Sequence, residues 1–351
     1  MRDKRIHEAL AYDDVLLVPQ YSEIESRSQV SLTTDMGNGL VLNLPVIASP
    51  MDTISGPAMC SVLDTAGGVG ILHRYNAVEK QVENVRTAIG EKPRNVGVAV
   101  GVTGDYLLRA LSASDAGANV VCVDVAHGHH TLVEKAIKTL REALGQDFHI
   151  MAGNVATLEG FDALADWGAD SVRCNIGGGS ICTTRIQTGH GVPGLHTLFE
   201  CASSENAGRV KIIADGGLRS SGDVVKAYAA GADVVMLGSM LAGTTESCGE
   251  LIHEYNPVTG KRESKKVYRG MASPEAQNDW RGRTSSLEGI SATVPFKGDA
   301  TAVLSKLEGG IRSGLSYSGA VSIPELHSKA RFIRQTPAGK AESGAHVLKG
   351  R

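Results

Sequence analysis

The sequence predicts an α/β fold, a (β/α)8 barrel forming one catalytic domain, and two observations carry this prediction. Short runs rich in valine and isoleucine recur along the chain and are mostly apolar throughout, as expected for strands buried on both faces of a parallel sheet. Segments that read as helices separate the runs, so that strands and helices alternate. The eight runs begin at Val46, Gly67, Asn95, Asn119, His149, Ser171, Lys211 and Val234.

A helix is well marked between the fifth and sixth runs. In residues 156–168, Thr157 can cap the N-terminus, Phe161 and Leu164 fall on one face, and Gly168 follows the last turn. An open doubly wound sheet is the alternative, because alternation alone does not show that a sheet closes. No GxGxxG motif follows the first run, so a Rossmann dinucleotide domain is unsupported.

The composition of the 351 residues is that of a globular protein, with 42% hydrophobic and 21% charged residues. The net charge of −3 gives no reason to expect nucleic acid or an anionic membrane as a partner. No apolar run reaches membrane-spanning length, and residues 1–8 lack the apolar segment of a secretory signal. The six cysteines are scattered without metal-type pairing. We therefore expect a cytoplasmic protein with reduced thiols.

Polar residues and glycines follow the runs, where a barrel places its active site. The loops after the strand C-termini build that site, and those after the last two strands commonly bind phosphate. The candidates at run ends are Ser49, Met51, Asp52, His73, Asp124, Asn154, Asn175, Asp215, Gly216, Gly217, Gly238 and Ser239. We expect a phosphate site at residues 215–217 and 238–239.

The segment of residues 175–185, here called the cysteine loop, carries the strongest chemical signal. Its three consecutive glycines, residues 177–179, leave backbone N–H groups free to face an anion, and Ser180 can add a hydroxyl donor. A thiolate at Cys182 could attack an electrophilic carbon of the bound ligand, with Thr184 as a proton-relay partner. The alternative is a glycine-rich surface loop beside a buried cysteine.

Three histidines, His127, His129 and His130, follow the fourth run. They lack the acidic or cysteine partners of a typical zinc site. Roles in a loop or in contacts to a dinucleotide are favoured over a metal site.

The pattern changes in residues 243–298, which we interpret as an insertion that bears a flap. Residues 254–260 read as a hairpin turn, and the polar residues 272–286, here called the lid segment, suggest a mobile lid. A disordered loop without function is the alternative. Further on, Leu304, Leu307 and Ile311 have helical spacing and should pack outside the barrel. The C-terminal tail, residues 336–351, is polar, and we expect it to be loosely ordered by itself.

The chain resembles the family of IMP dehydrogenases and GMP reductases over nearly its whole length. One of the matching motifs would be a weak signal, but all of them occur in order. They are residues 12–19, 49–53, 177–185, 214–217, 236–239, 268–271, 288–289 and 309–313.

This resemblance implies a covalent mechanism on a purine nucleotide monophosphate, GMP or IMP. It implies Cys182 as the nucleophile toward purine C2, with Thr184 and Glu288 moving protons. The residues that match substrate contacts are Ser49, Met51, Ser180, Asp215, Gly216, Gly217, Gly238, Ser239, Tyr268, Gly270, Met271 and Gly289. Asp215 would bind the ribose hydroxyls. Asp124, Ala126, His127 and Asn154 would contact the nicotinamide dinucleotide, which carries the redox step.

The two enzymes of the family differ in what leaves or arrives at C2. The dehydrogenase passes hydride from IMP to NAD and then hydrolyses the adduct to XMP, which needs a base for water. Dehydrogenases that resemble this chain carry an Arg-Tyr pair for that role on a longer flap, and none occurs between Met271 and Glu288, where Arg281 and Arg283 are the nearest substitutes. We therefore expect a GMP reductase that uses NADPH. The alternatives are an IMP dehydrogenase without the regulatory domain, using NAD, and a non-catalytic nucleotide-binding barrel.

Some features resemble the dehydrogenases instead. Residues 67–73, residues 124–129 and the tail at residues 342–346 are of that kind, and the tail resembles a potassium-binding segment. The resemblance implies a K⁺ site formed by the backbone carbonyls of Gly177, Gly179 and Cys182 with a neighbouring subunit, in a homotetramer or octamer. Asn175 and Gly178 depart from the usual loop of both enzymes, so that an atypical purine nucleotide stays open.

Overall fold

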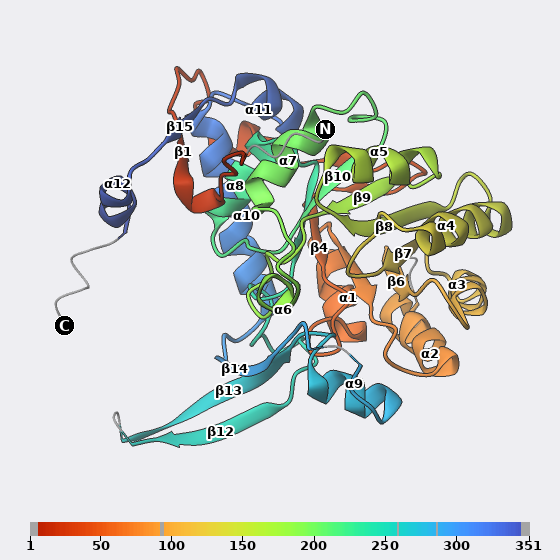
Figure 1. The fold of residues 1–351 in the computed structure, drawn as a ribbon. Coiled ribbons are helices and arrows are strands. Elements are labelled where there is room, and N and C mark those ends of the chain that lie inside the picture. Colours follow the sequence, from red (N-terminus) through yellow and green to blue (C-terminus); the bar gives the residue numbers. More distant parts are fainter. Residues whose placement is uncertain (1–5, 92–94, 258–259, 286, 345–351) are drawn as a thin grey trace.

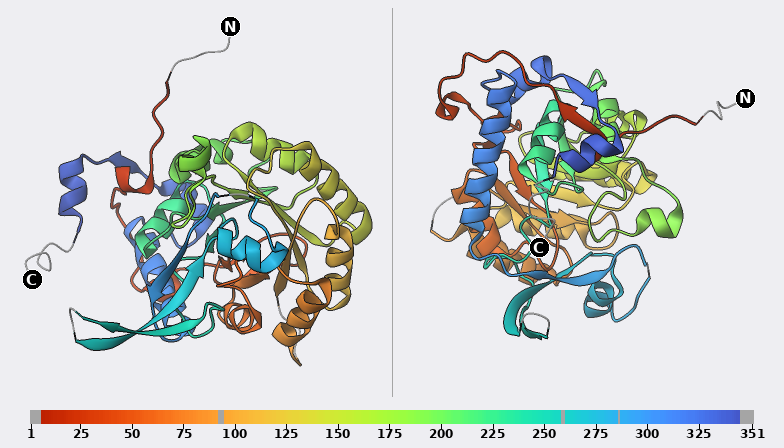
Figure 2. Two further views of the ribbon diagram at one scale, coloured as in Figure 1. Left: turned by 60° about the horizontal axis from the view of Figure 1, so that its bottom comes forward. Right: turned by 90° about the vertical axis from the view of Figure 1, so that its left-hand side faces the viewer.

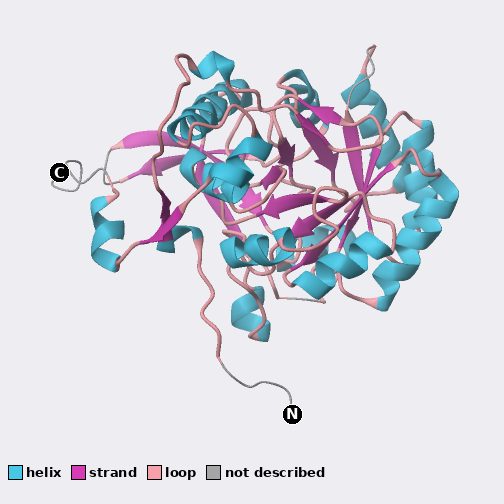
Figure 3. Ribbon diagram, turned by 90° about the horizontal axis from the view of Figure 1, so that it is seen from above, coloured by secondary structure: helices cyan, strands magenta, loops and turns pink. Residues whose placement is uncertain are grey.

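Eight parallel strands close into a barrel in the computed structural model, which describes residues 6–91, 95–257, 260–285 and 287–344. The strand order around the barrel is β10-β11-β4-β5-β6-β7-β8-β9, and Figure 3 shows the strands converging within a surround of helices. Every one of the eight apolar runs forms one of these strands, which confirms the predicted fold and excludes the open sheet. The strands are β4 (Val46–Ala48), β5 (Val69–Leu72), β6 (Val96–Val100), β7 (Val120–Asp124), β8 (His149–Val155), β9 (Ser171–Cys174), β10 (Lys211–Asp215) and β11 (Val234–Leu237).

Helices follow the strands and pack on the outside of the barrel (Figure 2). The surrounding helices are α1 (Pro57–Thr65), α2 (Val78–Ile89), α3 (Tyr106–Asp115), α4 (Thr131–Leu144), α5 (Leu158–Asp166), α7 (Gly194–Ala202), α8 (Ser221–Ala229) and α10 (Ala300–Tyr317). The expected cap is present, because the Thr157 side chain accepts a hydrogen bond from the backbone N–H of Gly160. Helix α10 packs against α8 and α1 and completes the ring, with Leu304, Leu307 and Ile311 buried as predicted.

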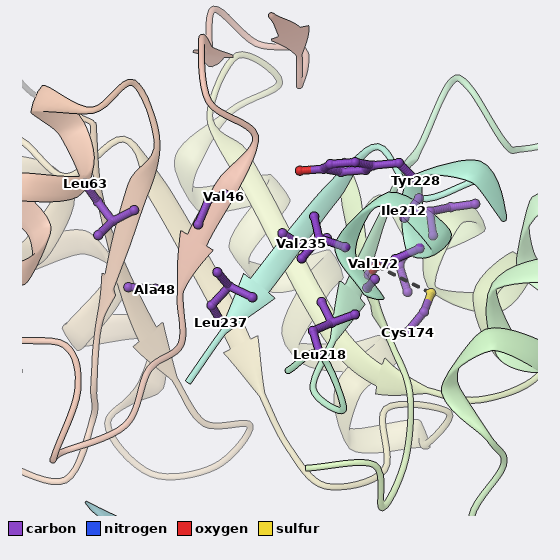
Figure 4. Close-up of a cluster of buried hydrophobic side chains, with 14 of the residues drawn as sticks. Val46, Ala48, Leu63, Val172, Cys174, Ile212, Leu218, Tyr228, Val235 and Leu237 are labelled. Atoms are coloured by element: carbon purple, nitrogen blue, oxygen red, sulfur yellow. Dashed lines mark hydrogen bonds between the residues drawn. The ribbon is translucent and has the colours of Figure 1, made fainter. Parts of the chain in front are cut away.

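The core has two layers because each strand presents alternate residues to opposite faces. In β4, Val46 and Ala48 face the helices, whereas Ile47 lies in the cluster inside the barrel. Figure 4 shows part of the outer layer, in which Val46, Ala48 and Leu63 lie near Val235 and Leu237. The short antiparallel pair β2 (Thr34–Asp35) and β3 (Val41–Leu42) supplies Leu42 to the inner cluster.

A strand near each end of the described chain pairs with the other beside the barrel, which the sequence did not indicate. Strand β1 (Val15–Leu17), which follows the 3-10 helix η1 (Tyr12–Asp14), pairs antiparallel with β15 (Phe332–Arg334). The tail is more ordered than expected, because α12 (Pro337–Glu342) is a helix whose Lys340 Nζ donates to Asp13 Oδ2 at 2.8 Å. Residues 345–351 of the tail lie outside the described residues. The remaining elements are η2 (Arg27–Gln29), α6 (Thr184–Thr188) and α11 (Ile323–Lys329).

The insertion forms a three-stranded antiparallel sheet that projects from one end of the barrel (Figure 1). Its strands are β12 (Leu251–Asn256), β13 (Lys261–Arg269) and β14 (Ser291–Pro295). Strands β12 and β13 pair antiparallel, as expected for the predicted hairpin, while residues 258–259 of its turn lie outside the described residues. The lid segment is not a loop throughout, since residues 274–281 form helix α9 (Pro274–Arg281), capped by the Ser273 side chain. No helix among the described residues is long and apolar enough to span a membrane.

Candidate active site

A cavity of about 510 Å³ opens at the C-terminal ends of the barrel strands. The residues expected to form the site converge on it, although they come from all parts of the chain. Those that line the cavity are Ser49, Met51, Asp124, Ala126, Asn154, Gly177, Gly179, Ser180, Cys182, Thr184, Asp215, Gly216, Gly217, Gly238, Ser239, Tyr268, Gly270, Met271, Glu288 and Gly289. His127 does not line the cavity, nor do Asp52 and His73 among the candidates at the run ends.

A chain of hydrogen bonds joins the thiol of Cys182 to a carboxylate. Cys182 Sγ lies 3.2 Å from Thr184 Oγ1, and Thr184 Oγ1 donates to Glu288 Oε2 at 2.8 Å. The backbone holds these groups together, because Cys182 forms an antiparallel bridge with Gly289, and Thr183 N–H donates to Glu288 O at 2.9 Å. Since Thr184 donates to the carboxylate, its oxygen is free to accept the thiol proton. This arrangement can carry a proton between sulfur and Glu288.

Two side chains donate hydrogen bonds to the carboxylate of Asp215, which lies at the end of β10. Its Oδ2 accepts from Asn154 Nδ2 at 2.8 Å, from Arg173 Nε at 3.0 Å and from Arg173 Nη2 at 2.9 Å. These bonds all fall on Oδ2, so that Oδ1 is available to accept hydrogen bonds from a ligand. A carboxylate fixed in this way suits vicinal hydroxyl groups.

Arg173 is a site residue that the sequence analysis missed. It lies on β9, is only 6% exposed, and its Nη1 donates to Asp124 Oδ1 at 2.5 Å as well as facing Asp215. Burial by itself opposes the charge, but the carboxylates of Asp215 and Asp124 raise the pKa of the guanidinium well above its ordinary value. The signal in the sequence was a single arginine inside an apolar run, because a buried charge needs partners.

Close approach of backbones shapes the part of the cavity expected to hold phosphate. Gly216 and Gly217 have φ values of +83° and +79°, and a Cβ on Gly216 would lie 3.3 Å from the backbone of Gly179. Next to Gly179 in the chain, Ser180 has its Oγ 3.4 Å from Tyr268 Oη. Ser49 Oγ is buried and has no hydrogen-bond partner in the described part of the chain. Hydroxyl groups and glycine backbone here surround a space suited to an oxyanion.

Helix α9 lies against the loop that follows β5, at the other side of the cavity. The rings of Tyr75 and Trp280 stack with centroids 4.0 Å apart and an angle of 14°, and the Arg281 guanidinium lies 3.7 Å from the Trp280 ring centroid. Arg74, whose Nε lies 3.9 Å from Asp124 Oδ2, lines the same side. This aromatic and cationic group comes from segments about 200 positions apart, and the sequence analysis did not identify it.

The three candidates that do not line the cavity are Asp52, His73 and His127. Asp52 forms an ion pair with Arg269 at 2.6 Å. Burial lowers the pKa of His73. Burial, followed by the nearby His129 and His130, also lowers the pKa of His127, which stands on the loop after β7.

The carbonyl groups expected to bind K⁺ belong to the cysteine loop, where Gly179 O already accepts from Cys182 N–H at 3.1 Å. A carbonyl oxygen has a second lone pair, so this bond is compatible with a cation ligand. The tail segment expected to complete the site, residues 342–346, is described only as far as residue 344.

Comparison with known proteins places nearly the whole chain in one family. The family model described as "IMP dehydrogenase / GMP reductase domain" matches residues 9–346. The inosine-5'-monophosphate dehydrogenase of Nitrosopumilus maritimus is 33% identical, with 97% of this chain and 98% of that protein covered. The GMP reductase of Leishmania major is 30% identical, with 97% of each chain covered.

A solved structure is similar over the same length. It is a cysteine-to-alanine variant of GMP reductase from Trypanosoma brucei in complex with guanosine 5'-monophosphate. The TM-score is 0.90 and the sequence identity 31%, with 97% of this chain and 98% of that chain covered. Relatives of both activities therefore share the fold, and the choice between the activities has to come from the site.

Proposed function

We propose that this chain, which belongs to the IMP dehydrogenase / GMP reductase family of oxidoreductases, is a GMP reductase that converts GMP and NADPH to IMP, ammonia and NADP. The observation that carries this choice is the short lid segment. Between Met271 and Glu288 it contains no Arg-Tyr pair, and residues 274–281 of the segment form helix α9. The chain of thiol, hydroxyl and carboxylate supplies proton transfer, whereas the Arg-Tyr pair that would activate water is missing from the lid segment.

In the proposed complex, the barrel mouth binds the nucleotide by its phosphate and ribose. Ser49 and Ser180, with the backbone at Gly217, Gly238 and Ser239 and the hydroxyl of Tyr268, surround the phosphate. Asp215 Oδ1 accepts from the ribose hydroxyls, and Arg173 and Asn154 fix its orientation. The base then lies between the cysteine loop and Met271, Gly270 and Gly289.

The reaction at C2 requires a nucleophile and a proton for the leaving group. The Cys182 thiolate forms a bond to C2, and the exocyclic amine takes a proton and leaves as ammonia. Glu288 receives the thiol proton through Thr184 and delivers it to the leaving amine, and the thiolate regains a proton from solvent at the end of the cycle. When bound, NADPH supplies the hydride that reduces C2. The C2–S bond then breaks, which releases IMP and regenerates the thiolate.

Residues at the second side of the cavity are suited to a dinucleotide. Asp124, Ala126 and Asn154 line it, and Arg74 and Arg281 add positive charge there. We expect these groups to contact the cofactor, with the charge favouring NADPH over NAD. His127, on the adjoining loop, would approach only the outer part of the cofactor.

One observation favours dehydrogenation of IMP as the second candidate function. Arg281 reaches the cavity from α9, and an arginine there is the first candidate to activate water for hydrolysis of the adduct. The product would then be XMP and the cofactor NAD.

The deciding experiment is an absorbance assay at the nicotinamide band with the full chain. GMP plus NADPH is compared with IMP plus NAD, and ammonia, IMP and XMP are quantified. We expect GMP-dependent loss of NADPH with stoichiometric ammonia. Rapid formation of XMP, without GMP-dependent oxidation of NADPH, would assign the chain to the dehydrogenases. Tight nucleotide binding without turnover in either direction would favour a non-catalytic barrel.

The proposal includes K⁺ and a homotetramer or octamer. The carbonyls of Gly177, Gly179 and Cys182 belong to the cysteine loop, and Ile186 of α6, which follows that loop directly, is 80% exposed. Activity in KCl against NaCl, and the mass by light scattering, test these two expectations.

A further inference from the structure

Two residues of the cysteine loop, Asn175 and Gly178, lie directly against each other. A Cβ placed on Gly178 would lie 2.7 Å from Asn175 Oδ1 and 2.8 Å from Asn175 Cγ, and closer still to Nδ2. A real Cβ atom essentially never has contacts this short, so that one of the two groups would have to move. The asparagine side chain therefore fills the space that any side chain at position 178 would need, and the two positions form one structural feature.

Asn175 connects the cysteine loop to the turn at residues 215–217, here called the ribose turn. Its Nδ2 donates to Asp215 O at 2.9 Å and to Gly216 O at 3.3 Å. Its backbone N–H donates to Val155 O at 2.8 Å, while its carbonyl accepts from Asn154 Nδ2 at 3.1 Å. The ends of β8, β9 and β10 thus meet at this one residue, which is 4% exposed.

Asparagine is an unfavourable residue for this position if stability alone is considered. Its φ is 141°, which glycine adopts more readily than any residue with a Cβ. Its Oδ1 is buried and has no hydrogen-bond partner in the described ranges, and an unpaired buried acceptor is destabilising. Glycine at 175 would remove both costs, so the side chain is better explained by what it positions.

We propose that the Asn175 side chain, matched to the missing side chain of Gly178, is a positioning device that holds the cysteine loop in register with the ribose turn. Cys182 follows Gly178 by four residues, and Asp215 is the residue whose carbonyl Asn175 binds. The amide thus fixes the distance between the nucleophile and the nucleotide's ribose. This inference rests on the proposed function in that the ligand is a purine nucleotide attacked by Cys182.

The test is a double-mutant cycle of Asn175→Gly and Gly178→Ser, with Gly309→Ser as the matched control. Gly309 lies in α10, and a Cβ there would meet no atom within 4 Å. Three quantities are measured for each variant: kcat and KM for the nucleotide, the alkylation rate of Cys182 by iodoacetamide from its peptide mass, and the thermal midpoint. If a residue had only a structural role, its substitution would shift the thermal midpoint but would not lower kcat selectively over KM.

For Gly178→Ser we expect kcat to fall by about 10²-fold, because a displacement near 1 Å can cost that much. For Asn175→Gly we expect kcat to fall about tenfold, KM to stay within about threefold, and the thermal midpoint to be unchanged or higher. The double variant should regain roughly tenfold over Gly178→Ser alone, since the clash is gone. Gly309→Ser should behave as the wild type.

Two results would overturn the inference. One is a double variant in which the fold-losses of the two single variants multiply, both in kcat and in the alkylation rate of Cys182. The other is a Gly178→Ser variant as active as the wild type while Asn175 is present. Failure of the proposed function is distinguishable, because it appears in the wild type as absent GMP-dependent oxidation of NADPH. In that case kcat and KM of the same variants are measured with IMP and NAD, and the alkylation rate of Cys182 is measured as before.

Discussion

Thr184 Oγ1 donates a 2.8 Å hydrogen bond to Glu288 Oε2, although 104 positions separate the two residues in the chain. The bond joins the cysteine loop to the segment that precedes β14, and it continues to Cys182 Sγ at 3.2 Å from the same hydroxyl. The threonine hydroxyl therefore links the Glu288 carboxylate to the sulfur of Cys182.

Glu288→Gln should lower the rate of GMP-dependent NADPH oxidation by roughly 10²–10⁴-fold, the usual loss for a general acid–base group. The amide keeps the size of the side chain but cannot deliver the proton that the leaving amine needs. Glu275→Gln, an exposed change on α9, is the control. Equal rates for the Glu288 variant and the control would remove Glu288 from the mechanism.

Cys182→Ala should abolish turnover and leave nucleotide affinity largely intact, because the phosphate and ribose contacts come from other residues. Steady-state assays and titration calorimetry with GMP measure the two effects. Cys248→Ala, a change at an exposed thiol outside the cavity, is the control. Near-native turnover without the Cys182 thiol would show that the covalent mechanism is wrong.

Asp215→Ala should weaken nucleotide binding strongly, since the ribose hydroxyls lose a charged acceptor worth roughly 1.5–3 kcal/mol. The structure adds a second consequence, because Arg173 loses one of its two carboxylate partners and stays buried. Asp215→Asn separates the effects by keeping the shape of the side chain. Calorimetry gives the affinity and thermal unfolding gives the stability. Unchanged affinity in both variants would contradict the ribose assignment.

Helix α9 should gain protection from hydrogen exchange when GMP and NADPH are both bound, because it lies over the cavity. Trp280→Ala should reduce that gain, since an aromatic pair such as Tyr75 and Trp280 contributes about 0.5–1.5 kcal/mol beyond its buried area. Exchange followed by mass spectrometry over residues 272–285 measures both. If the free and bound protein were equally protected, the lid segment would not be a lid.

Acid should destabilise the protein through His149, which is buried on β8 with Nε2 2.8 Å from Ser171 Oγ. Burial lowers the pKa of His149 to about 4, so between its ordinary value near 6.5 and pH 4 the unfolded chain binds a proton that the folded chain does not. Its contribution to stability is therefore complete above about pH 6.5 and is lost as the pH falls toward 4, on the order of 3 kcal/mol. His149→Gln should flatten this part of the stability curve in urea titrations. An unchanged acid slope would contradict it.

Local sequence was enough for the barrel and for most of the cavity. A strand such as β6 is buried on both faces, so Val96–Val100 is apolar throughout and can be recognised without its neighbours. Because parallel strands bring their C-terminal ends to one side, polar residues such as Ser49, Asp124 and Asp215 could be assigned to one mouth. The glycines before Cys182 marked the loop for the same local reason.

The tertiary structure alone decided which of these residues touch. Arg173 is an isolated charge in an apolar run of the sequence, and only the fold shows its partners, because β7 and β10 place Asp124 and Asp215 beside it. Tyr75 stacks on Trp280 only because α9 packs against the loop after β5. Such pairs carry no periodicity or spacing, since each depends on two segments that only the closed barrel brings together. The order of apolar and polar residues in the sequence indicates which residues are buried. Which distant residues contact one another depends on how the barrel closes.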